Sequence, residues 1–571
     1  MIGAYENAIT KERLSFQEVK RKAELLSTIF VQQYGLQPGE TVSLFSSNSI
    51  WYPVGVWATI RAGGRVNGAS PSYTIDETVH ALRTAKTKIL LTLPSSLPVA
   101  TAAAEKVGIP SSQILLLEGT APGTKSIQTL IKDAEAQNIS IIPTYRIPPG
   151  ETNKTTCGYL NFSSGTTGLP KAVMLSHHNI IAQCWQLRQL QVLASVHPPS
   201  TEHPHGLPAY RILAVMPLFH ITGLVRFVSY PVFMSGLSIM LPSFTLPTMV
   251  SNIIAYKLEE LILVPPILIR LVQDKSVDPY LPALRQTVKR WSSGAAPIAP
   301  ETIKALQRKF PSTGFRQGYG ATESTACISA HAPSHFDYKY AHTGGQLVAN
   351  TIAKVIALSP ATSDPSLSTT TSTSSEQLLG PNQTGEICAR GPQIAMGYLG
   401  NERATAESFD SDGFLHTGDV GYIDEEGLIV ISDRIKEMIK VRGQQVAPAE
   451  LEDLLLGRPE VEDVAVIGVP DAYSGEVPKA FVVLARRSRA AGQVEAEAEE
   501  EQQLNSIGHA LMEFTKQRTV PYKRIRSIEF VDHVPKSATG KLLRRVLKSW
   551  DRGEVKGRVG GFVVREEKAR L

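Results

Sequence analysis

One stretch of the sequence combines small, hydroxyl-bearing and basic residues at a spacing suited to binding phosphate groups. Six consecutive small residues follow a strand-like run at 159–162: Ser163, Ser164, Gly165, Thr166, Thr167 and Gly168. Small residues let backbone N–H groups approach an anion, hydroxyls add donors, and Lys171 supplies positive charge close behind. The stretch is not a Walker A loop, because Leu169 stands where that motif requires lysine. A flexible polar turn is the alternative interpretation.

Two further stretches carry groups suited to a nucleotide and to magnesium. In QGYGATES (317–324), Tyr319 offers an aromatic face between two glycines, and Thr322 and Glu323 offer the hard oxygen ligands that Mg²⁺ prefers. In HTGD (416–419), the Asp419 carboxylate could accept hydrogen bonds from both hydroxyls of a ribose. Each stretch taken alone could equally be a tight turn.

The elements that must position these residues alternate between strand and helix. Apolar strand-like runs and helix-like patterns occur at 41–47, 88–93, 211–216, 15–33 and 248–256. Such alternation predicts layered α/β units. Runs at 385–390 and 427–431 predict strands of a more β-rich part.

Composition narrows the class of protein. The 571 residues are 42% hydrophobic and 19% charged, which excludes a disordered, collagen-like or coiled-coil chain and allows two to four domains. Four scattered cysteines without a CxxC pair argue against a disulfide framework or a zinc module. The net charge is +5, and residues 504–571 hold 16 Lys and Arg against 7 Asp and Glu. A basic surface of this kind could meet a polyanion, but a solvated surface is the simpler interpretation.

A long uncharged run lies between Arg226 and Lys257 and is long enough to span a bilayer. Breakers interrupt it at Pro231, Pro242 and Pro247, and interior prolines remove helix hydrogen bonds. We therefore predict a buried core of strand and helix, and no transmembrane segment.

Taken together and in order, the motifs resemble the adenylate-forming superfamily of acyl-CoA synthetases, 4-coumarate–CoA ligases and luciferases, and best the 4-coumarate–CoA ligase-like branch. The matching signatures are FSSGTTGLPK (162–171), MPLFH (216–220), SSGAAP (292–297), QGYGATE (317–323), GEICARGP (385–392), HTGDVGY (416–422), DRIKEMIKVRGQQVAPAELE (433–452) and PKSATGK (535–541). The resemblance implies a large N-terminal body of layered sheets and helices (1–433) and a small mobile α+β C-terminal lid (434–571).

The same resemblance implies a two-step reaction with ATP, Mg²⁺ and coenzyme A. A small-molecule carboxylic acid attacks the α-phosphate of ATP to give acyl-AMP and pyrophosphate, and the thiol of coenzyme A then displaces AMP. Adenylation is needed because a carboxylate is a poor acyl donor. The protein's part is to position the reactants and to neutralise phosphate charge.

Residues of the family motifs carry over to this sequence as expectations. The ATP-binding set comprises Ser163 to Gly168 and Lys171 for the phosphates, Gln317, Gly318 and Tyr319 for adenine, Thr322 for a phosphate oxygen, and Asp419 and Arg434 for the ribose. Glu323 would bind magnesium.

The expected catalytic residues lie mostly near the C-terminus. Lys541 would bridge the carboxylate and the α-phosphate, while Lys440 and Gln445 would contact the acyl-adenylate. His220 would stand at the gate of the acyl pocket, and Lys436 would be the hinge at which the lid rotates.

Two alternatives to an acid–CoA ligase stay open. One is an adenylating enzyme that passes the acyl group to a carrier-protein thiol or another acceptor, and the other is a non-catalytic nucleotide-binding homologue. The chain also begins late relative to the family, and no nucleic acid is expected as a partner. The C-terminal Ala569-Arg570-Leu571 resembles a peroxisomal address, which an import receptor would read; without it the expected location is cytoplasmic.

Overall fold

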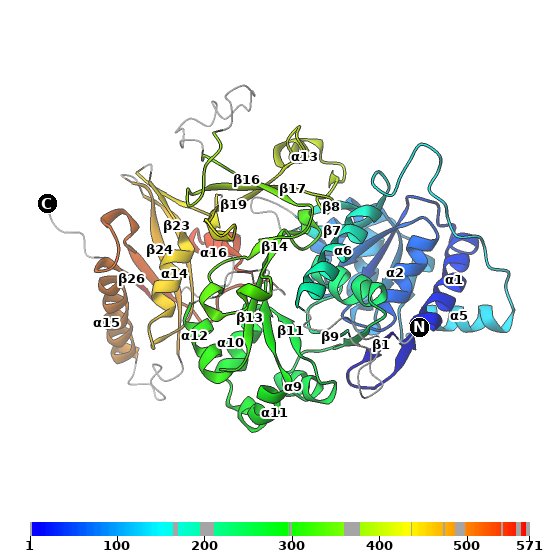
Figure 1. Ribbon diagram of the computed structural model, residues 1–571, viewed down its shortest axis with the longest axis horizontal. Coiled ribbons are helices and arrows are strands. Elements are labelled where there is room, and N and C mark those ends of the chain that lie inside the picture. Colours follow the sequence, from blue (N-terminus) through cyan, green and yellow to red (C-terminus); the bar gives the residue numbers. More distant parts are fainter. Residues whose placement is uncertain are drawn as a thin grey trace. The chain divides into compact units, whose positions relative to one another are not determined.

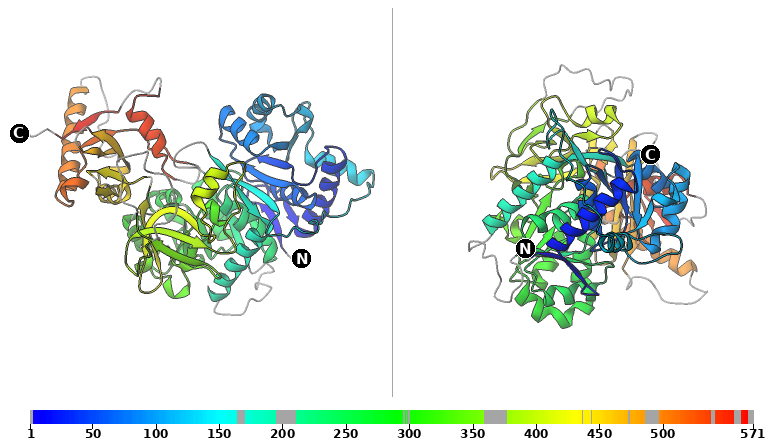
Figure 2. Two further views of the ribbon diagram at one scale, coloured as in Figure 1. Left: turned by 90° about the horizontal axis from the view of Figure 1, so that it is seen from above. Right: turned by 90° about the vertical axis from the view of Figure 1, so that its right-hand side faces the viewer.

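The computed structural model describes most of the chain: residues 3–163, 170–194, 210–294, 296, 298, 300–358, 377–435, 437–442, 444–471, 474–485, 497–537, 541–555 and 561–566. The chain divides into two compact units. The first unit comprises 1–295, 310–353 and 389–416, and the second unit comprises 296–309, 354–388 and 417–571. Helices and strands are mixed in both (Figures 1 and 2), which confirms the predicted α/β class. The lid boundary predicted at 433/434 lies within the second unit and stays a prediction.

A seven-stranded sheet is the largest sheet of the first unit. Its strands, in spatial order, are β18 (Gly397–Tyr398), β8 (Lys171–Ser176), β7 (Cys157–Ser163), β4 (Arg65–Ala69), β3 (Thr41–Phe45), β5 (Thr87–Thr92) and β6 (Ile114–Leu116). The strands from β7 to β6 are parallel, and β8 and β18 add an antiparallel edge. Parallel strands covered on both faces are apolar almost throughout, and all five residues of β3 are buried.

Helices cover both faces of the parallel strands. They are α1 (Phe16–Gln32), α2 (Tyr52–Arg61), α3 (Ile75–Thr84), α4 (Leu97–Val107) and α5 (Ile127–Ala136). Leu44 packs in the hydrophobic cluster of α1, α2 and α5, whereas Phe45 packs in the cluster of α3 and α4. The alternation of side chains along β3 therefore separates two cores.

Local sequence explains where two of these helices begin. Ser15 accepts a hydrogen bond from the backbone N–H of Glu18, and the Glu18 carboxylate accepts one from the Ser15 backbone N–H at 2.8 Å. Thr74 and Glu77 form the same capping box before α3. Each box satisfies backbone donors that the first helical turn leaves free.

Two smaller sheets complete the first unit. One has the order β2 (Arg13–Ser15), β1 (Ala4–Asn7), β10 (Leu237–Met240) and β9 (Arg211–Ala214). The other has the order β11 (Glu260–Leu263), β12 (Arg290–Ser293), β13 (Gly314–Tyr319), β14 (Ser329–Ala330) and β15 (Gln346–Leu347). Helices α6 (His177–Ala194), α9 (Leu246–Ala255), α10 (Pro265–Gln273) and α11 (Leu281–Thr287) belong to the same unit.

The long uncharged run folds into several short elements. A π-helical segment at Leu224–Ser229 leads into α8 (Tyr230–Phe233), β10 and α9. Within the described parts of the chain, no helix is both long and apolar enough to cross a membrane. The run therefore builds core, as the prolines predicted.

The second unit contains most of a four-stranded sheet and a second sheet. The four-stranded sheet has the order β16 (Ile352–Ile356), β17 (Gly385–Arg390), β19 (Leu415–Ile423) and β20 (Ile429–Arg434). The second has the order β22 (Gln444–Val446), β21 (Ile439–Val441), β24 (Gly475–Leu484), β25 (Ser527–Phe530) and β26 (Val563–Arg565), with β23 (Val461–Asp471) also paired to β24. Helices α14 (Pro448–Leu456), α15 (Glu497–Lys516) and α16 (Arg544–Asp551) accompany it.

Candidate active site

The predicted phosphate loop connects the two strands of a hairpin in the first unit. Strands β7 and β8 are antiparallel, and their register pairs Ser163 with Lys171. The residues Ser164 to Gly168 lie outside the described residues. The hairpin nevertheless fixes Ser163 and Lys171 opposite each other at the two ends of the loop.

A tyrosine links the lysine of this hairpin to the predicted magnesium ligand. The ammonium of Lys171 lies 4.6 Å from the centre of the Tyr398 ring, and the Tyr398 hydroxyl donates a 2.9 Å hydrogen bond to a carboxylate oxygen of Glu323. Burial, followed by the Glu323 charge, raises the pKa of Tyr398, so the hydroxyl stays protonated and donates. The structure thus brings together the lysine predicted to bind phosphate and the carboxylate predicted to bind a metal.

The turn that carries Glu323 has an unusual backbone. Thr322–Ser324 forms one 3₁₀ turn, and the two residues after it have positive φ, 50° at Thr325 and 95° at Ala326. Positive φ is costly for residues with a Cβ and often marks a functional site. The Thr325 hydroxyl donates to the Gln393 carbonyl at 2.6 Å and holds the turn in place. Gly320 is required because a Cβ there would lie 2.0 Å from the Ala326 carbonyl oxygen.

The residues predicted to bind adenine lie on β13, directly before that turn. Gly318 and Tyr319 pair with Ala330 and Ser329 of β14. The side-chain oxygen of Gln317 is buried and has no hydrogen-bond partner among the described residues. A buried acceptor without a partner is suited to a donor on a ligand, such as an amino group.

His220 caps the short helix Ile221–Gly223. Its Nδ1 accepts a long 3.4 Å hydrogen bond from the Thr222 backbone N–H, and the ring is half-buried. The Asn161 side chain on β7 donates to the Phe219 carbonyl at 3.0 Å. The strand of the phosphate hairpin therefore also positions the segment before His220.

In the second unit, the two predicted ribose-binding residues form an ion pair. Antiparallel strands β19 and β20 place Asp419 opposite Arg434, with 2.9 Å between the carboxylate and the guanidinium Nε. Asp419 is almost fully buried. The Thr417 hydroxyl accepts from the Asp419 backbone N–H at 3.1 Å and donates to the Ile387 carbonyl. The pair orients the Asp419 carboxylate.

Lys440 and Gln445 lie opposite each other on β21 and β22. Lys440 is exposed, and its backbone N–H donates to the Glu476 carboxylate at 2.9 Å. Directly opposed residues of an antiparallel pair share one face of the sheet. Lys436 lies outside the described residues, as does the side chain of Gln445.

Lys541 closes a loop at the start of the chain leading to α16. Its backbone N–H donates to the Ser537 hydroxyl at 3.1 Å, and its carbonyl accepts from the Ser537 backbone N–H at 2.8 Å. A bridge between Lys536 and Leu542 continues this pairing. Residues 538–540 lie outside the described residues.

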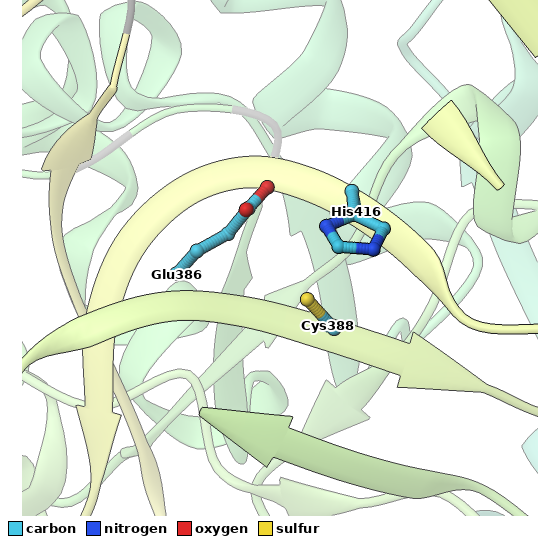
Figure 3. Close-up of side chains that lie close together, drawn as sticks. All are labelled: Glu386, Cys388 and His416. Atoms are coloured by element: carbon cyan, nitrogen blue, oxygen red, sulfur yellow. The ribbon is translucent and has the colours of Figure 1, made fainter. Parts of the chain in front are cut away.

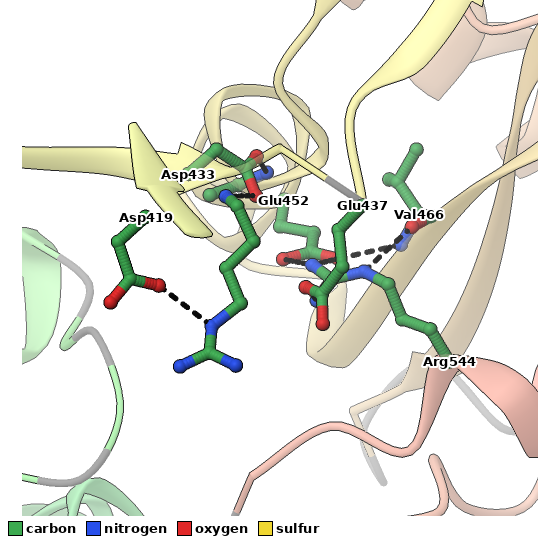
Figure 4. A network of polar contacts seen from close by, with 8 residues as sticks. Asp419, Asp433, Glu437, Glu452, Val466 and Arg544 are labelled. Atoms are coloured by element: carbon green, nitrogen blue, oxygen red, sulfur yellow. Dashed lines mark hydrogen bonds and ion pairs between the residues drawn. The ribbon is translucent and has the colours of Figure 1, made fainter. Parts of the chain in front are cut away.

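An arginine just after Lys541 is the centre of a buried network that the sequence did not reveal (Figure 4). The Arg544 guanidinium donates to both carboxylate oxygens of Glu452, at 2.7 and 2.8 Å, and to Glu437. Burial raises the pKa of Glu452 to about 7 and the pKa of nearby Asp433 to about 6. In the sequence, Arg544 is one of many basic residues near the C-terminus, and Tyr398 follows no recognised motif.

A second group of polar side chains lies on neighbouring strands β17 and β19 (Figure 3). Glu386, Cys388 and His416 each offer one metal-ligand atom, and these atoms lie within 4.8 Å of one another. The Glu386 carboxylate already accepts a 3.0 Å hydrogen bond from the Gly418 backbone N–H. We therefore interpret Glu386 as a residue that shapes the turn before Asp419.

Comparison with known proteins identifies relatives along nearly the whole chain. Residues 4–399 match the family model of the AMP-binding enzymes, and residues 450–541 match that of the AMP-binding enzyme C-terminal domain. The chain is 33% identical to peroxisomal OPC-8:0-CoA ligase 1 of Arabidopsis thaliana over 546 residues, covering 95% of this chain and 90% of the relative. It is 34% identical to 4-coumarate–CoA ligase of Pinus taeda over 523 residues, covering 90% and 86%.

Solved structures share the fold. ATP-bound MatB from Rhodopseudomonas palustris superposes with a TM-score of 0.76 at 24% identity, covering 96% of this chain and 95% of that one. The o-succinylbenzoate CoA synthetase MenE of Bacillus subtilis, in complex with the acyl-adenylate OSB-AMP, gives 0.74 at 22% identity, covering 98% and 96%.

Proposed function

The chain belongs to the family of AMP-binding enzymes, and from this premise we propose how its residues perform ATP-dependent acid–CoA ligation. The enzyme joins a carboxylic acid to coenzyme A in two steps. The acid displaces pyrophosphate from ATP to form acyl-AMP, and the coenzyme A thiol then displaces AMP to form the carbon–sulfur bond.

The observation that carries the proposal is the arrangement of Lys171, Tyr398 and Glu323. Lys171, at the end of a Ser/Thr/Gly loop, contacts the ring of Tyr398, and the hydroxyl of the same tyrosine is hydrogen-bonded to the Glu323 carboxylate. The hydroxyl and N–H donors of the loop sequence bind the phosphate oxygens. Lys171 adds a compact positive charge that attracts the same oxygens. The Tyr398 hydrogen bond orients the Glu323 carboxylate at the same place.

The Glu323 carboxylate and the Thr322 hydroxyl fit a magnesium ion, since both are hard oxygen donors next to the phosphate hairpin. Bound there, the ion would neutralise charge on the phosphates. Tyr319 stacks on adenine, and Gln317 and Gly318 line the adenine site.

In the second unit, the Asp419 carboxylate accepts hydrogen bonds from the ribose hydroxyls, and Arg434 orients that carboxylate. Lys541 neutralises the acid carboxylate and the α-phosphate during adenylation. Lys440 and Gln445, which are paired in the register of β21 and β22, act on the acyl-adenylate, and Lys436 is the hinge.

A panel of carboxylic acids tests the function. Pyrophosphate release should depend on the acid, and coenzyme A should be consumed in equal amount.

Lys541→Ala should lower acid-dependent pyrophosphate release by about 100-fold or more while ATP still binds. Arg545→Ala, an exposed basic residue four positions away, is the matched control and should behave as wild type. Normal pyrophosphate release by Lys541→Ala would refute its role, and pyrophosphate release without coenzyme A consumption would indicate another acceptor.

We also propose a peroxisomal location. The Arabidopsis relative is a peroxisomal ligase, and this chain ends in Ala569-Arg570-Leu571, which lies outside the described residues. An N-terminal fluorescent fusion should enter peroxisomes and should lose that location when the last three residues are removed. A cytosolic signal from the intact fusion would contradict the proposal.

A further inference from the structure

Among the described residues, Arg226 is a buried charge to which no carboxylate is bonded directly. It lies in the π-helical segment Leu224–Ser229, where the Tyr230 backbone N–H bonds to the Val225 carbonyl, five residues back. The residue is 9% exposed, and its Nε is buried with no hydrogen-bond partner among the described residues. A buried arginine normally has a carboxylate or carbonyl partner, because an unpaired buried charge is unfavourable. Short π-helical segments are also frequent at functional sites.

The hydroxyl groups of two tyrosines near Arg226 also have no hydrogen-bond partner among the described residues. The guanidinium carbon lies 5.6 Å from the centre of the Tyr230 ring, and the Tyr210 ring meets the Tyr230 ring edge-on at 5.0 Å. The hydroxyls of both tyrosines and the Nε of Arg226 are buried without a hydrogen-bond partner in the described structure. Burial raises the pKa of Tyr210 and of Tyr230, so both hydroxyls keep their protons and can donate.

The nearby carboxylate is already occupied by other arginines. Glu260 accepts from Arg316 at 2.9 Å, from Arg290 at 3.2 Å and from the Ser292 hydroxyl at 2.9 Å. Arg226 acts on the same carboxylate through its charge, without a direct bond, so three arginines share one carboxylate and the local charge is positive. An anion brought in from outside would balance Arg226.

The π-helical segment Leu224–Ser229 also lies close in the chain to His220, where the acyl pocket is predicted. Arg226 follows His220 by six residues, and its neighbours Leu224 and Val225 belong to the hydrophobic cluster that contains Tyr210 and Tyr230. Ala326, next to the Glu323 turn, packs against the same cluster. The Glu323 turn and the Arg226 segment therefore border one hydrophobic cluster.

We propose that Arg226, with the hydroxyls of Tyr210 and Tyr230, binds a second carboxylate at the far end of the substrate. The enzyme therefore prefers dicarboxylic acids, one carboxylate of which is activated while the other is held by Arg226. This inference rests on the proposed ligase function and names its substrate class.

The test compares monocarboxylic and dicarboxylic acids of equal chain length, from four to ten carbons, by acid-dependent pyrophosphate release. Wild type should favour the dicarboxylic acid by at least about 10-fold in kcat/KM at the best length, an expectation based on a buried charged contact. Arg226→Met should lose at least about 10-fold on that diacid, mainly through KM, while its activity on the matched monoacid is kept or increased. Tyr230→Phe should show a smaller loss in the same direction. Arg403→Met, a side chain 90% exposed on α13 (Glu402–Ser408), is the control and should keep the wild-type ratio.

The outcomes separate this inference from the ligase function. Turnover of monoacids with no preference for diacids at any length would overturn the inference and leave the ligase function standing. An equal loss on both acids in Arg226→Met would show a structural role only. If Arg226→Met does not fold, Arg226→Lys and the double variant Tyr210→Phe/Tyr230→Phe should each lower the diacid-to-monoacid ratio, and an unchanged ratio in both would overturn the inference. Absence of pyrophosphate release with every acid would overturn the ligase function and the inference together.

Discussion

Each of the two units buries a cluster of charged side chains, but the excess charge has the opposite sign. In the first unit one carboxylate, Glu260, meets three arginines: Arg226, Arg290 and Arg316. In the second unit one guanidinium, Arg544, meets three carboxylates: Asp433, Glu437 and Glu452.

The difference between the clusters lies in how each can relieve its excess charge. Burial acts to raise the pKa of Glu260, but the surrounding arginines outweigh it and hold that pKa well below its usual range. In the second unit burial prevails, and the pKa of Glu452 rises to about 7. A carboxylate can take up a proton, whereas an arginine does not release one in proteins. The second cluster can therefore adjust with pH, while the first cannot, and the proposed diacid substrate would bring it a further negative charge.

Glu260→Gln should cause the largest loss of stability. It removes the single carboxylate between Arg290 and Arg316, and we expect the free energy of unfolding to fall by about 3–5 kcal/mol. Urea denaturation at pH 7 measures this, and amide exchange of strands β11 to β13 should show where it acts. A loss below about 1 kcal/mol would contradict the description of Glu260 as the centre of the cluster.

Arg544→Met should cost less than Glu260→Gln at neutral pH. Without the guanidinium, Glu452 can take up a proton, which relieves part of the penalty of about 3–5 kcal/mol for an unpaired buried charge. The loss should be about 1–2 kcal/mol at pH 6 and larger at pH 8. A loss that does not change with pH would indicate that protonation of Glu452 plays no part.

Glu452 should also give the wild-type enzyme a pH dependence of stability. Its pKa is about 7 in the folded state against an ordinary value of 4.5, so between these values the folded state binds more protons than the unfolded state. This contribution is complete below pH 4.5 and is lost as pH rises to about 7, by at most about 1.4 kcal/mol per pH unit. Glu452→Gln should remove that slope in urea denaturation at pH 5, 6 and 7. Parallel curves for both proteins would show that Glu452 does not titrate in this range.

The smallest effect is expected at an exposed ion pair. Arg403 and Glu407 are 3.4 Å apart on α13, with side chains 90% and 54% exposed. Arg403→Met should change the free energy of unfolding by no more than about 0.5 kcal/mol, because solvent screens such pairs. A larger change would mean that exposure is not what separates this pair from the buried clusters.

Much of the local structure could be predicted from the sequence. The helix expected at 15–33 is α1 at Phe16–Gln32, and the strand expected at 41–47 is β3 at Thr41–Phe45. Both depend on short-range signals, a capping box and a continuous apolar run. Asp419 and Arg434 were both predicted from family motifs to hold the ribose, but only the register of β19 and β20 shows that they touch.

The sequence by itself determined the order of motifs, the apolar strands and helices, and the types of residue available for phosphate, metal and acid. These are properties of neighbouring residues. Only the tertiary structure decided that Tyr398 joins Lys171 to Glu323, and that the Nε of Arg226 has no hydrogen-bond partner among the described residues while Glu260 has several. Such contacts depend on strand order and register, which bring together residues far apart in the chain, and on burial, which no single stretch of sequence specifies.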